Sequence, residues 1–294
     1  MSDRFQRLGF AMARRLSVLI LTVVAAALAS AALVRFAPGF GMDERLLDSR
    51  LSEESLASIR SVGDSTGLAA EFGRYFAGLL RGDWGESISL HRPVRELMAE
   101  RGALTAHTLG AGLIMAWILA LVLAFALEAF RRRAADVAAT VFAGALLCVP
   151  AAVVAMVFLY LAAPPALALA AILFPRIFRY VRNILAAASA RPHVLAAEAR
   201  GVGRCRLLCR HISLPAAGEL FALAGVSVSM ALGAVIPVEA LCDSPGVGQL
   251  VWQSAMARDA PVLIHLTFVV ALVTCAANLL TDGAQAAVSR EAET

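Results

Sequence analysis

The sequence predicts an all-α, polytopic membrane protein with six transmembrane helices, and three observations support this. Hydrophobic residues make up 60% of the 294 residues and charged residues only 16%, whereas soluble domains carry about 25% charged residues. The chain contains several apolar runs close to the length of about 20 residues that a membrane-spanning helix needs. Its basic residues, all of them arginine, cluster beside some of these runs and not others.

Five apolar runs qualify directly as spans: residues 16–34, 103–127, 137–163, 216–238 and 261–280. We expect the first to be a retained span rather than a signal peptide, because no small-residue cleavage site follows it. A weaker sixth run, residues 164–182, carries Arg176, Arg179 and Arg182 in its second half. An arginine near the end of a span can extend its head group to the interface, which avoids the cost of about 2.5–3.5 kcal/mol at the bilayer centre.

The arginine clusters decide the number of spans and their orientation. They lie before the first run, between the second and third runs, and from Arg176 to Arg210. Short basic segments stay in the cytoplasm, and only six spans with an inward N-terminus put all three clusters there. The predicted cytoplasmic segments are residues 1–15, 183–215 and 281–294, and the predicted external segments are residues 35–102 and 239–260. Between the third and fourth spans only a stub at Pro164 and Pro165 lies outside.

The residues contain no pattern for enzyme chemistry. The glycines at Gly201–Gly203 and Pro245–Gly248 lack the lysine and serine or threonine that grip phosphates, so neither is a nucleotide-binding loop. We therefore expect no catalytic residue, no cofactor and no ATP site in this chain.

Two clusters allow a second interpretation. Cys205, Cys209 and His211 could hold a metal ion, but a fourth ligand is missing, and we expect no metal there. Arg176, Arg179 and Arg182 recur every three residues, as in a voltage sensor. We interpret them instead as a cytoplasmic helix end that meets anionic lipid headgroups.

The segment 183–215 predicts a helix, a glycine break and a second helix. The first helix is rich in alanine and runs to Arg200, Gly201 and Gly203 break it, and the second helix continues until Pro215 turns the chain into the next span. Nucleic-acid binding is not expected, because no aromatic side chains interleave the arginines. A bent pair of helices with small side chains suits a docking surface, which a partner groove can approach closely.

This segment resembles the cytoplasmic signature loop of bacterial ABC-importer permeases, in which Glu-Ala-Ala, three residues and Gly precede an Ile-x-Leu-Pro ending. The leading glutamate of that pattern is leucine here. The residues that the resemblance assigns to coupling with an ATPase are Leu195, Ala196, Ala197, Gly201, Gly203, His211, Leu214 and Pro215.

The rest of the chain is similar to the first of the two paired membrane subunits in the peptide and nickel branch of these importers. Its external motifs are Gly-Asp-x-Gly-x-Ser, Pro-Gly-x-Gly and Arg-Asp-x-Pro-Val. They correspond to Gly82, Asp83, Gly85, Ser87, Pro245, Gly246, Gly248, Arg258 and Asp259. The sequence Asn278–Asp282 matches the close of the last span. The short stub between spans three and four departs from the family, whose members have a substantial loop there.

The resemblance implies a type I ABC importer permease fold in the bacterial inner membrane, with both termini cytoplasmic. It also implies a homologous second permease subunit, two ABC ATPase subunits and an external solute-binding protein. Short peptides are the expected solute, and nickel or a metal chelate is the alternative. A secondary transporter or channel that uses the arginines of span four is a more distant alternative, and an intramembrane enzyme would need a catalytic dyad that we do not find.

Overall fold

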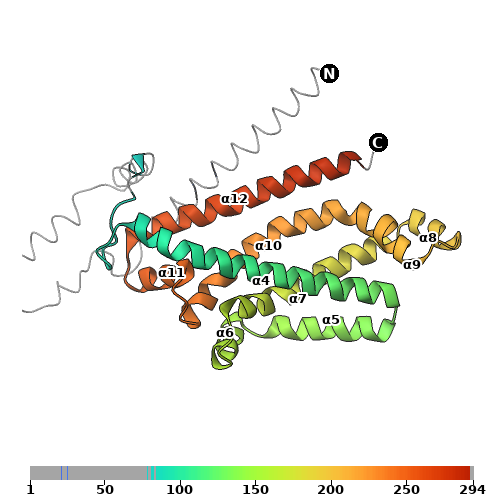
Figure 1. Cartoon of the computed structure of the whole chain (residues 1–294), viewed down its shortest axis with the longest axis horizontal. Helices are drawn as coiled ribbons and strands as arrows, with labels where there is room; N and C mark the ends of the chain where they lie inside the picture. Colours follow the sequence, from blue (N-terminus) through green and yellow to red (C-terminus); the bar gives the residue numbers. More distant parts are fainter. Residues whose placement is uncertain (1–20, 22–24, 26–77, 79–80, 83, 292–294) are drawn as a thin grey trace, which may run out of the picture. The chain divides into compact units, whose positions relative to one another are not determined.

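A computed structural model describes residues 21, 25, 78, 81–82 and 84–291 (Figure 1). The predicted first span apart from two residues, most of the external segment 35–102, and Asp83 lie outside the described residues. The described part is mostly helical, and its one β pairing is the isolated bridge between Glu86 and Pro93. Its helices are α4 Val94–Phe130, α5 Arg133–Cys148, α6 Ala151–Tyr160, α7 Pro165–Ser189, α8 Pro192–Ala199, α9 Arg204–Arg206, the π-helix η2 Leu207–Ser213, α10 Leu214–Leu241, α11 Val247–Met256 and α12 Ala260–Glu291.

The chain divides into two compact units. The first unit comprises residues 1–100 and 253–271, and the second unit comprises residues 101–252 and 272–294. Helices α4 and α12 each contribute residues to both units.

Three helical segments of the described chain are long and apolar enough to cross a membrane: Val94–Phe130, Arg204–Leu241 and Pro261–Thr281. A fourth is added if α5 and α6 count as one broken span. Helix α7 does not meet this test, because Arg176, Arg179 and Arg182 lower its hydropathy. The chain is therefore a helical, multi-pass membrane protein, and the count of six spans stays a prediction.

The predicted third span is bent. Helices α5 and α6 meet at 92°, although the sequence reads as one apolar run over residues 137–163. The break lies at Val149 and Pro150, where Val149 is extended with φ −80° and ψ 123°. Proline lacks a backbone N–H and disfavours helical geometry in the residue before it. We overlooked this proline because hydropathy alone does not register backbone geometry.

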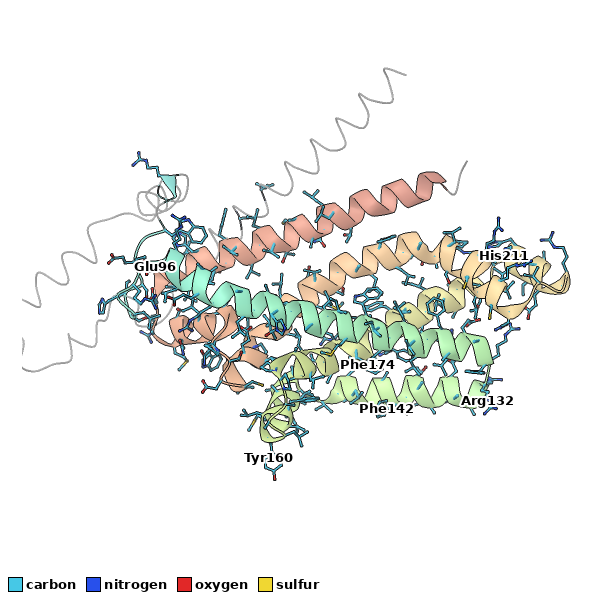
Figure 2. All side chains as sticks on the ribbon, in the orientation of Figure 1. Glu96, Arg132, Phe142, Tyr160, Phe174 and His211 are labelled. Carbon is cyan, nitrogen blue, oxygen red and sulfur yellow. The ribbon has the colours of Figure 1, made fainter. Side chains whose placement is uncertain are left out.

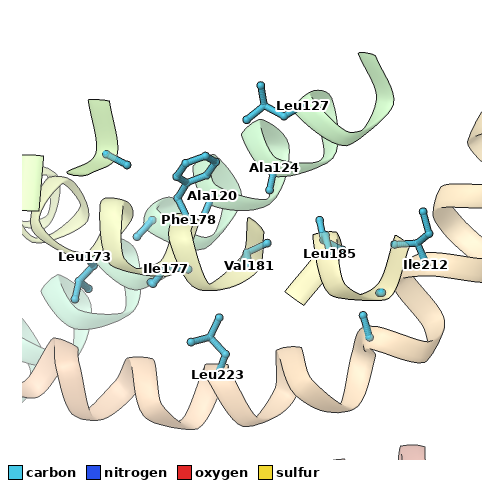
Figure 3. Packing of buried hydrophobic residues seen from close by; sticks show 14 of the residues in the cluster. Ala120, Ala124, Leu127, Leu173, Ile177, Phe178, Val181, Leu185, Ile212 and Leu223 are labelled. Atoms are coloured by element: carbon cyan, nitrogen blue, oxygen red, sulfur yellow. The ribbon is translucent and has the colours of Figure 1, made fainter. Parts of the chain in front are cut away.

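Small residues on one face of α4 let it pack closely against α7 in the second unit. Ala116, Ala120 and Ala124 recur every four residues and are fully buried, and Gly112 continues the series. A Cβ placed on Gly112 would lie 2.9 Å from a Leu169 side-chain carbon of α7. Small residues at this spacing allow close helix–helix contact in membranes, and Figure 3 shows α4 and α7 meeting through this core.

Helix α7 is central to the second unit, where it packs against α5, α6 and α10. Its fully buried side chains include Leu173, Ile177, Phe178 and Val181, which belong to the main hydrophobic core (Figure 3). Helix α7 runs to Ser189, seven residues beyond the predicted end of span four. Helix α7 therefore connects the hydrophobic core directly to residues 183–215, the segment that the sequence predicts to be a docking surface.

Candidate functional site: a helical elbow

The segment from Leu195 to Pro215, which we call the elbow, joins α8 to α10 in the second unit. Helix α8 begins at Pro192, because this proline and the bend at Ala190 and Arg191 separate it from α7. Beyond α8 the chain turns at Gly201 and enters α9 and η2. The predicted succession of helix, glycine break and helix is confirmed, with one additional break before Pro192.

Gly201 makes the turn possible. Its φ is +78°, in the left-handed region where a side chain is strained. The amide of Val202 donates to the Ala197 carbonyl at 3.2 Å, and the amide of Gly201 donates to the Glu198 carbonyl at 2.9 Å. This pair of hydrogen bonds is the Schellman arrangement that closes a helix C-terminus. Gly203, in contrast, has φ −59° and precedes α9 without strain.

Pro215 does not turn the chain, contrary to our prediction. Residues Arg204–Leu241 form one continuous helical stretch, with π-helical geometry over Leu207–Ser213 immediately before the proline. A wider π turn separates the proline ring from the carbonyl that it would meet in a regular α-helix. The Ser213 hydroxyl also donates to the Leu208 carbonyl at 2.7 Å.

The buried face of the elbow anchors it to the core. Ala197, Leu207 and Ile212, together with Val194 immediately before the elbow, are each at most 2% exposed and belong to the same cluster as α7. Ala197, which the resemblance assigns to coupling, therefore faces the core in this chain, and its role in coupling stays a prediction. Every third or fourth residue of a helix points inward, and Ala197 shares the inward face with Val194.

The exposed face of the elbow is available to a partner. Leu195 is 53% exposed and Leu214 is 65% exposed. Ala196, Gly201 and Gly203 are also exposed. His211 is half-buried, and its carbonyl lies 3.2 Å from Nε2 of His193.

Ion pairs fasten the elbow to the ends of α4, α5 and α7. The carboxylate of Glu128, on α4, is only 6% exposed and accepts from Arg182 of α7 at 2.9 Å. Arg182 also donates to Asp136 of α5 at 2.6 Å. Arg204 of α9 donates to the Glu128 carbonyl and lies 3.7 Å from its carboxylate. Arg182 is thus held by two carboxylates, and our interpretation of it as a lipid contact is wrong.

A second pair of contacts extends this arrangement to α8. Glu198 accepts from Arg131 at 2.6 Å and lies 3.6 Å from Arg204. Glu128, Asp136, Arg131, Glu198, Arg182 and Arg204 together form what we call the ion-pair lattice. Sequence reasoning missed the acids of this lattice, because Glu128 and Asp136 bind arginines that are far away in the sequence and only folding brings these pairs together. The lattice joins the elbow, directly or through Glu128, to α4, α5 and α7.

The external motifs meet in the first unit through Asp259. Its buried carboxylate accepts hydrogen bonds from the hydroxyls of Ser87 and Ser89 and from the Ser89 amide. Burial alone would raise the pKa of Asp259, but these hydrogen bonds outweigh it and hold the pKa below its ordinary value. Gly82 and Gly85 have φ of +75° and +66°. The serine and aspartate therefore fasten two distant loops together.

The Pro-Gly-x-Gly motif surrounds a second carboxylate, in the second unit. Glu239 of α10 is fully buried and accepts from the Gly248 amide at 2.7 Å and from the Thr105 hydroxyl at 3.0 Å. A Cβ on Gly246 would collide with this carboxylate. Pro245 itself is exposed. The glycines thus let the backbone close around the glutamate, and we call this arrangement the Glu239 clamp.

Two further observations complete the site. No group of three or more His, Cys, Asp or Glu side chains that could hold a metal occurs in the described part of the chain. Arg258, whose φ is +55°, is exposed next to the buried Asp259.

The arrangement of an exposed elbow on a membrane-spanning helical core agrees with the comparison with known families. The profile of a family described as "Binding-protein-dependent transport system inner membrane component" matches residues 110–293, which include the elbow, Glu239 and the Pro-Gly-x-Gly motif. The chain belongs to this family. It is an inner-membrane permease component of an ABC importer, in the branch that includes peptide, glutathione and nickel permeases.

Individual relatives of this permease differ in their named solutes. It is 24% identical over 248 residues to a glutathione transport system permease protein of Salmonella paratyphi A, covering 78% of this chain and 81% of the relative. It is 22% identical over 271 residues to a nickel import system permease protein of Staphylococcus aureus, covering 85% and 82%. A Brucella ovis protein named as a peptide permease is 30% identical over 112 residues, which cover 38% of this chain and 35% of that protein.

Proposed function

We propose that the elbow docks a cytoplasmic ATPase subunit and that the permease imports short peptides. The observation that carries the docking proposal is the division of the elbow into two faces. Val194, Ala197, Leu207 and Ile212 fix it to the core, while Leu195 and Leu214 are exposed beside small residues. A partner could therefore bind the exposed face and displace the elbow, while the buried face keeps the elbow packed against the core helices.

ATP binding in a partner would displace the elbow, and the helices would then change their access from one side of the membrane to the other. Such switching is a rigid-body movement between two discrete packings. The ion-pair lattice supports this proposal, because Glu128, Asp136 and Arg182 belong to three helices that would move together with the elbow.

The permease would act as half of a translocation path, beside a homologous second permease subunit. An external solute-binding protein would deliver the solute to the opposite face. Peptides are supported by the relatives named for a peptide and for glutathione, which is itself a short peptide. The staphylococcal relative supports nickel as the second candidate solute.

A charge placed on the exposed face of the elbow tests the docking role. Ala196→Arg should abolish co-purification of the ATPase subunits and peptide uptake, because a large cation would block the close approach of a partner groove. Ala255→Arg, at an exposed alanine of α11, is the control for the substitution itself. Retained co-purification and uptake in Ala196→Arg would refute the proposal.

The orientation of the permease is tested by its own thiols. Cys205 and Cys209 are exposed on the elbow. In a chain that keeps only these two cysteines, we expect labelling by an impermeant thiol reagent in inside-out vesicles and none in intact cells. Labelling in intact cells would place the elbow outside and exclude ATPase docking.

A channel or secondary transporter makes a different prediction. It would move solute in proteoliposomes that contain the permease subunits alone, driven by a membrane potential. We expect uptake only when the ATPases, ATP and the solute-binding protein are all present.

A further inference from the structure

Two adjoining cavities in the second unit both have Arg176 in their lining. The first has a volume of about 400 Å³ and is mostly apolar, with Met115 of α4, Phe142 of α5 and Phe174 of α7 among its lining residues. Figure 2 shows Phe142 and Phe174 on neighbouring helices. The second has a volume of about 430 Å³ and is lined by Leu147, Arg176, Arg179, Tyr180, Asn183 and Met230. Leu147 and Arg176 line both cavities, so an apolar space continues into a cationic one.

Arg176 lies near the middle of α7 and shares each cavity with a residue at or near the centre of another predicted span. Arg176 is near the middle of α7, which runs from Pro165 to Ser189. Met115, which shares a cavity with Arg176, is the central residue of the predicted span 103–127. Met230, which shares the other cavity, is close to the centre of the predicted span 216–238. An arginine at such a depth is costly unless it faces a water-filled cavity or a partner.

Arg182, on the same helix as Arg176 and Arg179, has a structural role and differs from them in its contacts. It is 17% exposed and bound by Glu128 and Asp136. For Arg176 and Arg179, the described residues provide no ion pair, and both side chains are exposed. Both guanidinium groups are therefore open to water or to an anion that enters the cavity.

We propose that Arg176 and Arg179 form an anion-attracting wall of the translocation path, which receives the carboxylate of a peptide in transit. The apolar cavity beside Arg176 accommodates uncharged side chains of the same peptide. This inference rests on the proposed import function and sharpens its solute class. Two arginines on the wall attract an organic anion and repel a bare divalent cation, so they favour peptides or anionic chelates over free nickel. The phosphate of a lipid headgroup shares the carboxylate's chemistry and is the competing occupant.

Thiol labelling of a single cysteine in the second cavity tests this wall. Asn183→Cys is introduced after the five native cysteines are replaced, and the importer is assembled in membrane vesicles. Labelling rates are measured with an anionic ethylsulfonate methanethiosulfonate and a cationic trimethylammonium methanethiosulfonate. Each rate is divided by the same reagent's rate with free cysteine. Val141→Cys, at a position of α5 that is 66% exposed and lines neither cavity, is the matched control.

We expect Asn183→Cys to react with both reagents, with a corrected preference of about tenfold for the anionic one. The double substitution Arg176→Gln and Arg179→Gln should reduce this ratio to near one, and Arg176→Lys with Arg179→Lys should preserve it. No reaction at Asn183→Cys, or a ratio near one with both arginines present, overturns the proposal without any arginine variant.

Lipid composition distinguishes the two anions. If headgroups occupy the cavity, labelling will be blocked in bilayers that contain phosphatidylglycerol and will appear only in pure phosphatidylcholine, and this result also overturns the proposal. Equal labelling in both bilayers supports a solute path. Because labelling requires neither ATP nor uptake, it separates a failure of this inference from a failure of ATPase docking.

Discussion

The two ends of α10 are fastened in different ways. At its start, the elbow is held by the ion-pair lattice, whose outer pair of Arg131 and Glu198 is 55% and 39% exposed. At its end, the fully buried carboxylate of Glu239 accepts from the Gly248 amide and from the Thr105 hydroxyl.

The contacts at the elbow can therefore rearrange more easily than the contacts of the Glu239 clamp. The exposed pair of Arg131 and Glu198 can exchange partners at small cost, because exposed ion pairs contribute at most about 1 kcal/mol. A buried carboxylate that binds backbone amides has no alternative partner, and leaving those amides unpaired costs about 1–3 kcal/mol each. We therefore infer that movement is concentrated at the elbow, while the Glu239 clamp holds its loop in place.

The largest expected effect is at the Glu239 clamp. Glu239→Ala should lower the free energy of unfolding by about 3 kcal/mol, because the Gly248 amide and the Thr105 hydroxyl lose their acceptor. Thermal unfolding of the purified protein in detergent measures this loss. Glu219→Ala, on the same helix in a largely exposed pair with Arg191, should cost less than about 1 kcal/mol. Equal losses of unfolding free energy in Glu239→Ala and Glu219→Ala would show that the two ends of α10 are held equally strongly.

The next effect is at the centre of the ion-pair lattice. Glu128→Ala removes the carboxylate that Arg182 and Arg204 share and should cost about 2 kcal/mol, less than a fully buried pair because Arg182 keeps Asp136. ATP-driven uptake should fall together with stability. Glu198→Ala, in the exposed part of the lattice, should change unfolding by less than about 1 kcal/mol. If both variants transport normally, the lattice does not transmit movement.

A smaller effect is expected at the turn of the elbow. Gly201→Ala must place a side chain at φ +78°, which costs about 1–2 kcal/mol. Gly203→Ala should leave stability nearly unchanged, since its φ is −59° and a Cβ there meets no atom within 4 Å. The difference between the unfolding temperatures of the two variants measures the cost of a side chain at the left-handed backbone conformation of Gly201. Identical unfolding temperatures would contradict this cost.

The smallest effect at neutral pH concerns Asp259 in the first unit. Its folded pKa lies below the ordinary value of 3.8, so its contribution to stability is fully present above about pH 4 and is lost as the pH falls through the folded value. The unfolding temperature of the native chain should drop in this acid range. Asp259→Asn should be less stable at neutral pH and should show a shallower acid dependence. Parallel acid profiles would mean that Asp259 contributes no pH dependence.

Much of the elbow could be predicted from the sequence, and its orientation toward the core could not. The glycine break at Gly201 follows from local backbone preference, and the chain shows it as expected. The burial of Ala197 was not predictable, because nothing in the sequence distinguishes the inward alanine from Ala196 and Ala199. The ion-pair lattice was also missed, since Glu128 and Asp136 are far in sequence from Arg182, which binds both of them.

The sequence by itself determined that this is a helical inner-membrane permease, because the length and spacing of apolar runs and the local motifs are properties of consecutive residues. Only the tertiary structure decided which arginine serves which purpose. Arg182 and Arg176 stand six residues apart on one helix, yet one meets two carboxylates and the other faces a cavity. The environment of a charge depends on what neighbouring helices bring to it, and that is fixed only when the helices pack.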